Sequence, residues 1–258
     1  MRCIEKDSAM KTAIVIPARY ASSRLPAKAL LRATGKYLIQ HVYERACESK
    51  ADTVIVATDD ARIFQAVESF GGKVAMTRQD HPSGTDRVAE VAAKLDADII
   101  VNVQGDEPMI EPGALDMLAR LLDQDRGAKM ATLATPIATL ELLRDANCVK
   151  VVCDKQGRAL YFSRSPIPFV RDGEPNFSKQ PWRFLQHLGL YAYRRRFLLK
   201  LAKLPPEPLE ETEKLEQLRV LALGYRIQVG VVPAAHRGVD TPADYQRFVE
   251  IYRKSQAA

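Results

Sequence analysis

Short apolar runs rich in β-branched residues alternate with amphipathic helical patterns along this chain, and this alternation restricts the fold more than any other feature. The runs predict buried strands at residues 12–17, 53–58, 99–103 and 130–136. Between them, residues 37–48 and 86–95 place their apolar side chains on one face of a helix. Alternating strands and helices favour a mainly parallel, doubly wound sheet, so the predicted fold class is α/β.

The pattern changes in the middle of the chain. Strand-like runs at residues 149–154 and 158–162 are joined by Lys155-Gln156-Gly157, a connection typical of a hairpin, so the sheet is expected to become mixed there. Residues 166–181 are rich in proline, polar and charged residues and show no sustained period, which predicts a long loop that serves as a lid or a subunit contact.

The last third predicts a return to helix and strand. A helix is expected over residues 211–223, ended by Gly224, and a strand over 226–232. A final helix is expected to begin at Thr241-Pro242, with Asp244 as its capping acid.

Length and composition fit one globular domain, which we place at residues 11–258. Of the 258 residues, 47% are hydrophobic and 27% are charged, as in an ordinary soluble protein. Residues 1–10 mix charges of both signs and lack the apolar run of a secretory signal. Because a strand pattern starts directly after Met10, we expect these residues to be a disordered extension; an upstream start codon wrongly included is the alternative. The apolar stretches are far shorter than the roughly 20 residues of a membrane-spanning helix. These features predict a cytoplasmic protein that is not embedded in a membrane.

Charge and metal-ligand patterns exclude two further classes. The net charge is +6, but there is no block of five like charges and no basic stripe interleaved with aromatic residues, which argues against nucleic-acid binding. The four cysteines and four histidines match no zinc spacing, and reduced thiols fit better than a disulfide framework.

A loop after the first predicted strand carries three cations, Arg19, Arg24 and Lys28. It lies beyond the carboxyl end of the strand, where open α/β sheets bind ligands. Arginine supplies planar, bidentate donors for phosphate, and lysine supplies a mobile point charge. The loop is neither a Walker A sequence nor GxGxxG, and it suits a triphosphate; an ordinary solvated basic loop is the alternative.

Acidic residues follow two other predicted strands. The strand at 99–103 runs into Gln104, Gly105, Asp106 and Glu107, and Asp240 follows the last predicted strand. Magnesium is commonly held by one or two carboxylates together with substrate phosphates, so Asp106 and Asp240 form a candidate Mg²⁺ pair. The alternatives are a turn acid at Asp106 and helix-start chemistry at Asp240.

Residues 78–87 combine a turn with a helix start, in which Ser83 and Asp86 form a capping-box pattern. A capped helix without ligand contact is as consistent with this pattern as nucleotide binding by the loop. We include Arg78, Ser83 and Gln104 among the candidate nucleotide contacts.

Taken in order, these segments resemble one family, the 3-deoxy-manno-octulosonate cytidylyltransferases, also called CMP-KDO synthetases. The resemblance runs from about Lys11 to the final helix. Its most specific pieces are IPARYASSRLPAK (16–28), MTRQDHPSGTDR (76–87), VNVQGDEPMI (101–110), ALYFSRSPIP (159–168), HLGLYAYR (187–194), EKLEQLRVL (213–221) and GVDTP (238–242). The chain departs from the family pattern RLPGKPL, with Ala27 in place of a glycine and Ala29 in place of a proline. Loss of the glycine disfavours positive φ beside Lys28.

The resemblance implies a Rossmann-like nucleotidyltransferase fold, a mixed, mainly parallel sheet flanked by helices. A smaller inserted region at about 136–195 would bind the sugar and dimerise. It implies a cytosolic homodimer that couples CTP to 3-deoxy-manno-octulosonate (KDO) for lipopolysaccharide synthesis and releases pyrophosphate. By the resemblance, Arg19 and Lys28 bind phosphate, and Asp106 and Asp240 bind Mg²⁺. The residues expected around the sugar acid are Arg164, His187, Tyr191, Glu216 and Gln217.

Charge neutralisation explains how such a chain would act, because displacement at phosphorus depends on positioning and electrostatics. In this hypothesis, Arg164 and His187 are charge-assisted donors to the sugar carboxylate. Tyr191 as a core residue, and Glu216 and Gln217 as a polar helix face, are the alternatives. The open alternatives for function are CMP transfer to amino-KDO or another nonulosonate, a glycosyltransferase, and a nucleotide-binding protein without turnover.

Overall fold

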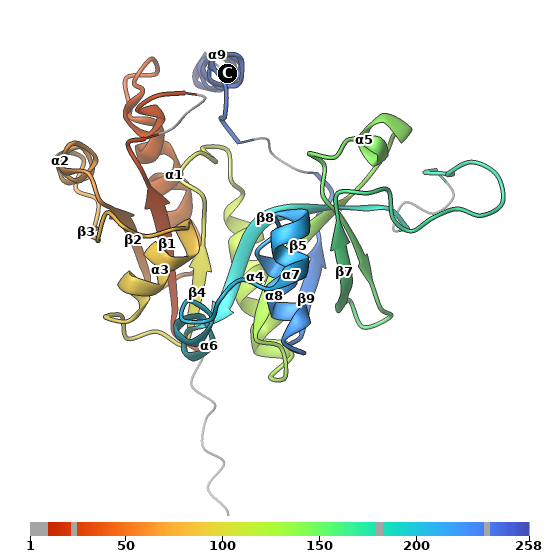
Figure 1. Ribbon diagram of the computed structural model, residues 1–258. Helices are drawn as coiled ribbons and strands as arrows, with labels where there is room; N and C mark the ends of the chain where they lie inside the picture. Colours follow the sequence, from red (N-terminus) through yellow and green to blue (C-terminus); the bar gives the residue numbers. More distant parts are fainter. Residues whose placement is uncertain (1–9, 22–24, 179–182, 235–237, 258) are drawn as a thin grey trace, which may run out of the picture.

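The strands of the computed structural model, which describes residues 10–21, 25–178, 183–234 and 238–257, form one sheet in the order β3-β2-β1-β4-β8-β5-β9. These path strands are β1 (Thr12–Ala18), β2 (Thr53–Thr58), β3 (Val74–Met76), β4 (Ile99–Asn102), β5 (Met130–Pro136), β8 (Leu185–Arg194) and β9 (Ile227–Val231). β1 pairs in parallel with β2 and β4, and β5 pairs in parallel with β9. β8 is antiparallel to β4 and β5 (Figure 1). The prediction of a mixed, mainly parallel α/β sheet is confirmed.

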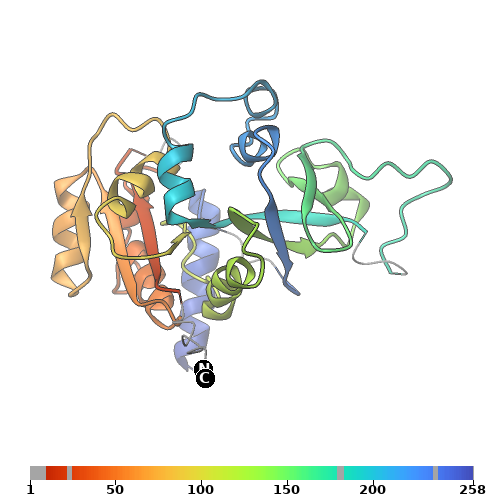
Figure 2. The same ribbon diagram turned by 90° about the horizontal axis from the view of Figure 1, so that it is seen from below.

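Helices cover both faces of this sheet (Figure 2). One face packs against α3 (Gly84–Ala92), α6 (Arg195–Leu201) and α8 (Gln217–Ala222). The other face packs against α1 (Leu38–Cys47), α2 (Ala61–Ser69) and α4 (Pro112–Gln124). Both faces of β1 and β4 are buried, so these strands read as continuous apolar runs rather than as alternating ones.

The predicted hairpin is present at the side of the sheet. β6 (Lys150–Cys153) pairs antiparallel with β7 (Ala159–Ser163), and β6 also pairs with β8. Residues 166–178, the described part of the predicted loop, form no helix or strand and extend beyond β7 in Figure 1. The expected extension at 1–10 lies outside the described residues except for Met10.

The predicted single helix at residues 211–223 is wrong. The structure has α7 (Pro208–Glu213) and α8, separated by Lys214 with a left-handed φ of 53°. A Glu207–Glu210 capping box starts α7 before the predicted boundary. The final helix α9 (Pro242–Ala257) begins as predicted. The strand pattern around Tyr191 corresponds to β8. The sequence patterns did not single out α2, β3, α4, α6, the short helix α5 (Leu140–Arg144) or the 3₁₀ turn η1 (Lys28–Leu30). Within the described ranges, none of the helices has both the length and the apolar character needed to cross a bilayer.

Candidate active site

Lys28 brings together two carboxylates that lie far apart in the sequence. Its Nζ forms a short ion pair with Asp106 and lies 3.2 Å from Asp240 Oδ1. The three side chains are partly buried, with exposed fractions of 18% for Lys28, 22% for Asp106 and 43% for Asp240. Burial alone would lower the pKa of Lys28, but attraction and hydrogen bonding from Asp106, followed by Asp240, raise it above its usual value. The two acids therefore face one cation.

The parallel strands explain the position of Asp106. β1 and β4 are parallel neighbours, so the loops that follow them leave the same edge of the sheet. A Cβ at Gly105 would come within 2.9 Å of the Pro17 carbonyl oxygen, so the glycine permits the loop after β4 to approach the end of β1 closely. The carboxyl ends of the two strands thereby place Asp106 near the loop that carries Lys28.

Asp240 is held beside Asp106 by the start of α9. The Val239 N–H donates to the Asp106 carbonyl at 2.7 Å. Val239 is buried with Leu25, Leu38, Phe248 and Val249, so packing of α9 fixes the segment before it. The Thr241 hydroxyl and backbone N–H donate to Asp244 Oδ2 at 2.7 and 3.0 Å, which completes the predicted cap.

Ala27 precedes Lys28 in a left-handed conformation, with φ 53° and ψ 27°. The sequence predicted that alanine would disfavour positive φ at this position; the chain nevertheless adopts it. For a residue with a Cβ this conformation costs about 1 kcal/mol. The loop therefore keeps a glycine-like backbone beside the cation despite the substitution.

Glu107 adds a further carboxyl group at this edge. Burial, followed by repulsion from Asp106 and Asp240, raises its pKa to about 8. The described residues contain no group of three or more His, Cys, Asp or Glu side chains arranged to hold a metal ion. Asp106 and Asp240 are nevertheless oxygen donors that converge on one cation, a donor set that suits Mg²⁺ when phosphate oxygens complete its shell.

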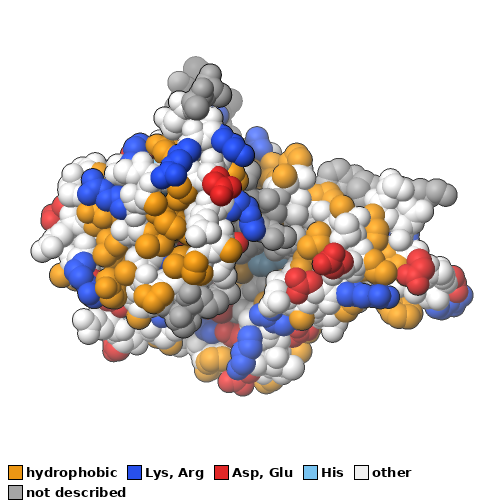
Figure 3. Space-filling view, turned by 90° about the horizontal axis from the view of Figure 1, so that it is seen from above, with side chains coloured by type: hydrophobic (Ala, Val, Ile, Leu, Met, Phe, Trp, Pro, Cys, Tyr) orange, Lys and Arg blue, Asp and Glu red, His pale blue; other side chains and the backbone are white. Residues whose placement is uncertain are grey.

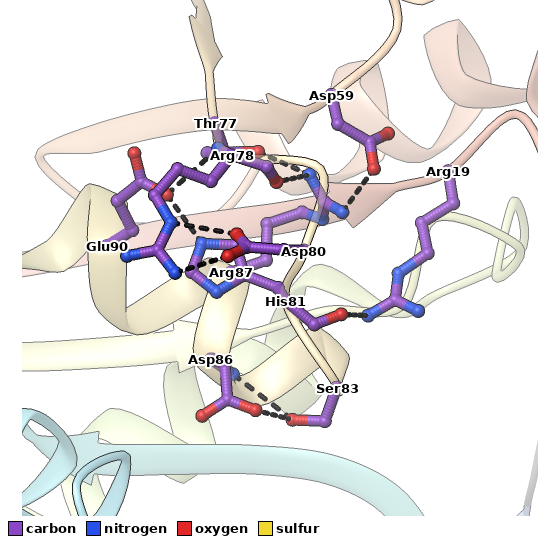
Figure 4. Close-up of polar contacts among 10 residues, drawn as sticks. All are labelled: Arg19, Asp59, Thr77, Arg78, Asp80, His81, Ser83, Asp86, Arg87 and Glu90. Atoms are coloured by element: carbon purple, nitrogen blue, oxygen red, sulfur yellow. Dashed lines mark hydrogen bonds and ion pairs between the residues drawn. The ribbon is translucent and has the colours of Figure 1, made fainter.

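Three candidate nucleotide contacts, Arg19, Arg78 and Ser83, lie in or beside the loop between β3 and α3 (Figure 4). Arg19 donates to the His81 carbonyl at 3.2 Å. Ser83 caps α3 by accepting from the Asp86 N–H, as predicted, while Arg78 forms an exposed ion pair with Asp80. Gln104 lies two residues after the end of β4, at the same edge, and is partly buried. Arg24 lies outside the described residues.

The candidate sugar contacts divide into three places. Tyr191, Glu216 and Gln217 line a cavity of about 20 Å³ together with Ser83. The Tyr191 hydroxyl donates to Gln217 Oε1 at 3.3 Å, and the Thr85 hydroxyl donates to Glu216 Oε2 at 2.7 Å. A cavity of this size holds one water molecule, so a sugar would need the surrounding side chains to move.

His187 and Arg164 lie elsewhere. His187 lines a cleft of about 1160 Å³ that also reaches Glu107 and Asp240, and the surface seen from above is hollowed between the two parts of the molecule (Figure 3). The Arg164 guanidinium donates to the carbonyls of Glu213 and Ala146, at 2.7 and 3.0 Å. Arg164 is not among the residues that line this cleft in the described chain.

The charge state of His187 differs from the expectation. Burial lowers its pKa to about 3, so the ring is neutral at neutral pH rather than a charge-assisted donor. Its Nε2 lies 2.9 Å from Thr132 Oγ1, whose hydroxyl has the Leu190 carbonyl at 2.8 Å as an acceptor. With the hydroxyl hydrogen directed to that carbonyl, the Nε2–H of His187 donates to Thr132.

Sequence patterns did not single out a buried pair at the same edge of the sheet. Arg87 is fully buried, and its guanidinium lies 2.6 Å from Asp59 Oδ2. Asp59 follows β2 as Asp106 follows β4, and this repeated strand-end position was the available signal. Arg87 falls within the cap pattern of α3, which concealed its contact with a distant strand.

Comparisons with known proteins agree on one family. The family model described as cytidylyltransferase matches residues 13–227. A 3-deoxy-manno-octulosonate cytidylyltransferase from Geobacter metallireducens is 52% identical over 247 residues, which cover 93% of this chain and 97% of the relative. One from Solibacter usitatus is 48% identical over 242 residues, covering 93% and 94%.

Solved structures extend this similarity to three dimensions. A CMP:2-keto-3-deoxy-manno-octonic acid synthetase complexed with CTP has a TM-score of 0.89 and 47% identity, covering 95% of this chain and 99% of that one. A cytidylyltransferase from Leptospira borgpetersenii, with a TM-score of 0.59 and 19% identity over 96% of each chain, shares the fold.

Proposed function

The chain belongs to the 3-deoxy-manno-octulosonate cytidylyltransferases, and we propose that it couples CTP to KDO at the carboxyl edge of its sheet, giving CMP-KDO and pyrophosphate. The observation that carries this placement is the convergence of Asp106 and Asp240 on Lys28 Nζ. The product would serve lipopolysaccharide synthesis. We place the enzyme in the cytoplasm and take Mg²⁺ as its cofactor.

The reaction transfers the cytidylyl group in one displacement. A KDO hydroxyl oxygen forms a bond to the α-phosphorus of CTP, the bond from that phosphorus to the bridging oxygen breaks, and pyrophosphate leaves with the electron pair. The hydroxyl proton goes to solvent or a nearby base. The rate of such a displacement depends on holding the reactants in line and neutralising phosphate charge.

Asp106 and Asp240 would hold Mg²⁺, with the triphosphate completing the oxygen shell. Bound there, Mg²⁺ would withdraw charge from the phosphate and lower the pKa of the attacking hydroxyl. Before substrate binds, Lys28 keeps the two carboxylates together. Once released from them, its ammonium can turn toward the phosphates, and Arg19, on the same loop, adds a planar donor for the leaving pyrophosphate.

The remaining contacts support a sugar acid beside this centre. His187 lines the cleft that reaches Asp240, and its ring centroid lies 5.5 Å from that of Tyr191. Tyr191, Glu216 and Gln217 would bind sugar hydroxyls after the small cavity opens. A neutral His187 would bind the sugar by hydrogen bonding rather than as a cation.

We also propose that the enzyme is a homodimer that uses the region at about 136–195. Leu160 on β7 is 62% exposed, and Phe169 in the following loop is 86% exposed. Large apolar side chains left in water at this end of the sheet suit a subunit contact. Sedimentation velocity at micromolar concentration would yield the mass of two chains; the mass of one chain would contradict the proposal.

The test of function is a substrate panel with CTP and Mg²⁺. KDO, an amino-substituted KDO, another nonulosonate and a neutral sugar are supplied separately, while pyrophosphate is measured and the conjugate is identified by mass. We expect pyrophosphate and CMP-KDO in equal amounts, with KDO used best. Preference for a different acidic sugar, or CTP binding without a conjugate, would contradict the proposal.

A further inference from the structure

The fully buried guanidinium of Arg87 joins the ends of two neighbouring strands. From α3, it lies 2.6 Å from Asp59, directly after β2, and it donates to the Thr77 hydroxyl, directly after β3, through a short hydrogen bond. A weaker contact of 3.4 Å reaches the Arg78 carbonyl (Figure 4). Arg87 therefore fixes the point at which the chain leaves β3.

Stability alone gives a weak reason for this arrangement. Taking both charges out of water offsets much of the attraction within a buried ion pair, so such pairs add little net stability. In addition, the buried Nε of Arg87 has no hydrogen-bond partner among the residues that the structure describes. The planar guanidinium of Arg87 instead fixes the relative positions of Asp59 and Thr77, because its nitrogens contact both residues at the same time.

Glu90, one turn further along α3, holds the middle of the same loop. Its Oε2 accepts from the Arg78 backbone N–H at 3.1 Å and lies 2.5 Å from His81 Nε2. Ser83 then closes the loop as the cap of α3. Residues 77–83 are thus held from α3 at their start, middle and end.

The contacts that hold the loop at residues 77–83 extend through His81 to Arg19. The side chain of His81 is bound by Glu90, and its carbonyl accepts from Arg19 at 3.2 Å. Arg19 follows β1, and Gly84, the first residue of α3, lies against Pro17 of that strand. A shift of the loop would therefore move the acceptor that orients the Arg19 guanidinium.

We propose that Arg87 is a positioning residue for Arg19, acting through the loop at residues 77–83 and assisted by Glu90. The inference rests on the proposed function, in which Arg19 binds the triphosphate of CTP. Arg87 touches neither nucleotide nor sugar in this account. Its effect is on the orientation of a cation that does.

The test is a double-mutant cycle on CTP affinity, measured by calorimetry with Mg²⁺ and without sugar. Arg87→Lys keeps the charge but cannot hold Asp59 and Thr77 together, and we expect it to raise the Kd for CTP about 10-fold, the scale of one charge-assisted hydrogen bond. In an Arg19→Ala background the same substitution should change the Kd less than about 2-fold, because the residue through which it acts is absent.

Arg194→Lys is the matched control, because Arg194 also donates to several backbone groups, the carbonyls of Ala128, Leu122 and Asp125, but lies at the end of β8, remote from the loop. It should lower Tm and leave the Kd for CTP unchanged. If Arg87→Lys does not fold, Glu90→Gln decides, with an expected rise of about 3-fold in Kd that also disappears in the Arg19→Ala background.

The outcomes distinguish failure of the positioning role of Arg87 from failure of the proposed function. The positioning role would be overturned if the wild type binds CTP and folded Arg87→Lys binds it with the same Kd. If Arg87→Lys does not fold, an unchanged Kd in Glu90→Gln would overturn it. Equal losses with and without Arg19 would overturn it as well. Failure of the wild type to bind CTP would instead overturn the proposed function and, with it, the premise of the inference.

Discussion

Lys28 Nζ lies between Asp106 and Asp240, and a divalent cation held by the same two carboxylates would have to replace it. Repulsion between like charges makes simultaneous occupancy costly in a partly buried site. Without nucleotide, Lys28 should therefore weaken metal binding. With CTP bound, the phosphates offer the ammonium another partner.

We predict that Lys28→Met binds Mn²⁺ about 10-fold more tightly than the wild type in the absence of CTP, because no ammonium has to leave. Free Mn²⁺ can be measured by electron paramagnetic resonance. Lys36→Met is the control, since Lys36 pairs with Glu44 on α1 instead, and it should bind Mn²⁺ like the wild type. Equal or weaker binding by Lys28→Met would show that the ammonium does not compete.

At the scale of residues, strand ends were the informative signal in the sequence. Asp106 could be identified because an apolar run stops at Val103, three residues before it. The partnership of Arg87 with Asp59 could not, since 28 positions separate them and contact depends on the order of the strands. The sequence also did not indicate that Arg164 and His187 lie in different places. The carbonyls that accept from Arg164, those of Glu213 and Ala146, are distant from it in the sequence.

Helix α9 links the stability of the fold to the proposed metal site, because Asp240 lies two residues before the helix. The Thr241 side chain accepts from the Asp244 N–H at 3.2 Å and donates to Asp244 Oδ2. Packing and capping together hold Asp240 beside Asp106. The cap should therefore contribute to metal affinity as well as to folding.

We predict that Thr241→Ala lowers the free energy of unfolding by about 1 kcal/mol, the usual cost of a lost N-cap. It should also weaken Mn²⁺ binding in the presence of CTP. Thr139→Ala removes the N-cap of α5, where the Thr139 side chain accepts from Leu142, and should cost similar stability without the metal effect. Urea unfolding and Mn²⁺ titration check both variants. Identical Mn²⁺ affinities of Thr241→Ala and Thr139→Ala would show that the cap of α9 does not contribute to metal binding.

Helix prediction failed where a backbone angle, rather than a residue preference, set the boundary. Residues 211–223 have the composition of one helix, yet Lys214 takes φ 53° and divides them. Lysine gives no signal for that conformation, unlike glycine or asparagine. By contrast, Ser83 and Thr241 marked helix starts correctly because their capping chemistry is local.

At the scale of the whole molecule, two histidines of the described ranges, His41 and His187, are buried in uncharged form. Burial lowers the pKa of His41 to about 4, against a smaller opposing effect of Glu44 and in the same direction as Lys36. Burial lowers the pKa of His187 to about 3. The unfolded chain binds protons near pH 6.5, whereas the folded protein resists protonation, so stability is full above that pH and falls as the pH drops.

We predict that the free energy of unfolding falls by about 2 kcal/mol per histidine between pH 7.5 and pH 5, since each pKa unit corresponds to about 1.4 kcal/mol. Urea unfolding at the two pH values measures the change. His41→Gln should reduce the fall by about half. A free energy that is constant or rises toward pH 5 would contradict the neutral buried state of these rings.

The α/β class and the mixed sheet were readable from the sequence, because buried parallel strands leave continuous apolar runs. The central position of β8 was not. Its pairing with β4 and β5 joins residues that are distant in the sequence, such as Met130 with Tyr193 and Asn102 with Tyr191, and local patterns carry no information on such contacts. The resemblance to a family compensated for this limit at the level of function, but the contacts of each site residue required the structure.

The most direct test of the central claim is a double-mutant cycle on CMP-KDO formation with Asp106→Asn and Asp240→Asn, measured across Mg²⁺ concentrations. Because both carboxylates would serve one ion, each single variant should lose at least about 100-fold in kcat/KM, and the double variant should lose little more. Asp123→Asn, at an exposed position of α4, should behave as the wild type. Near-normal activity in either single variant, or fully additive losses in the double variant, would contradict a shared magnesium site.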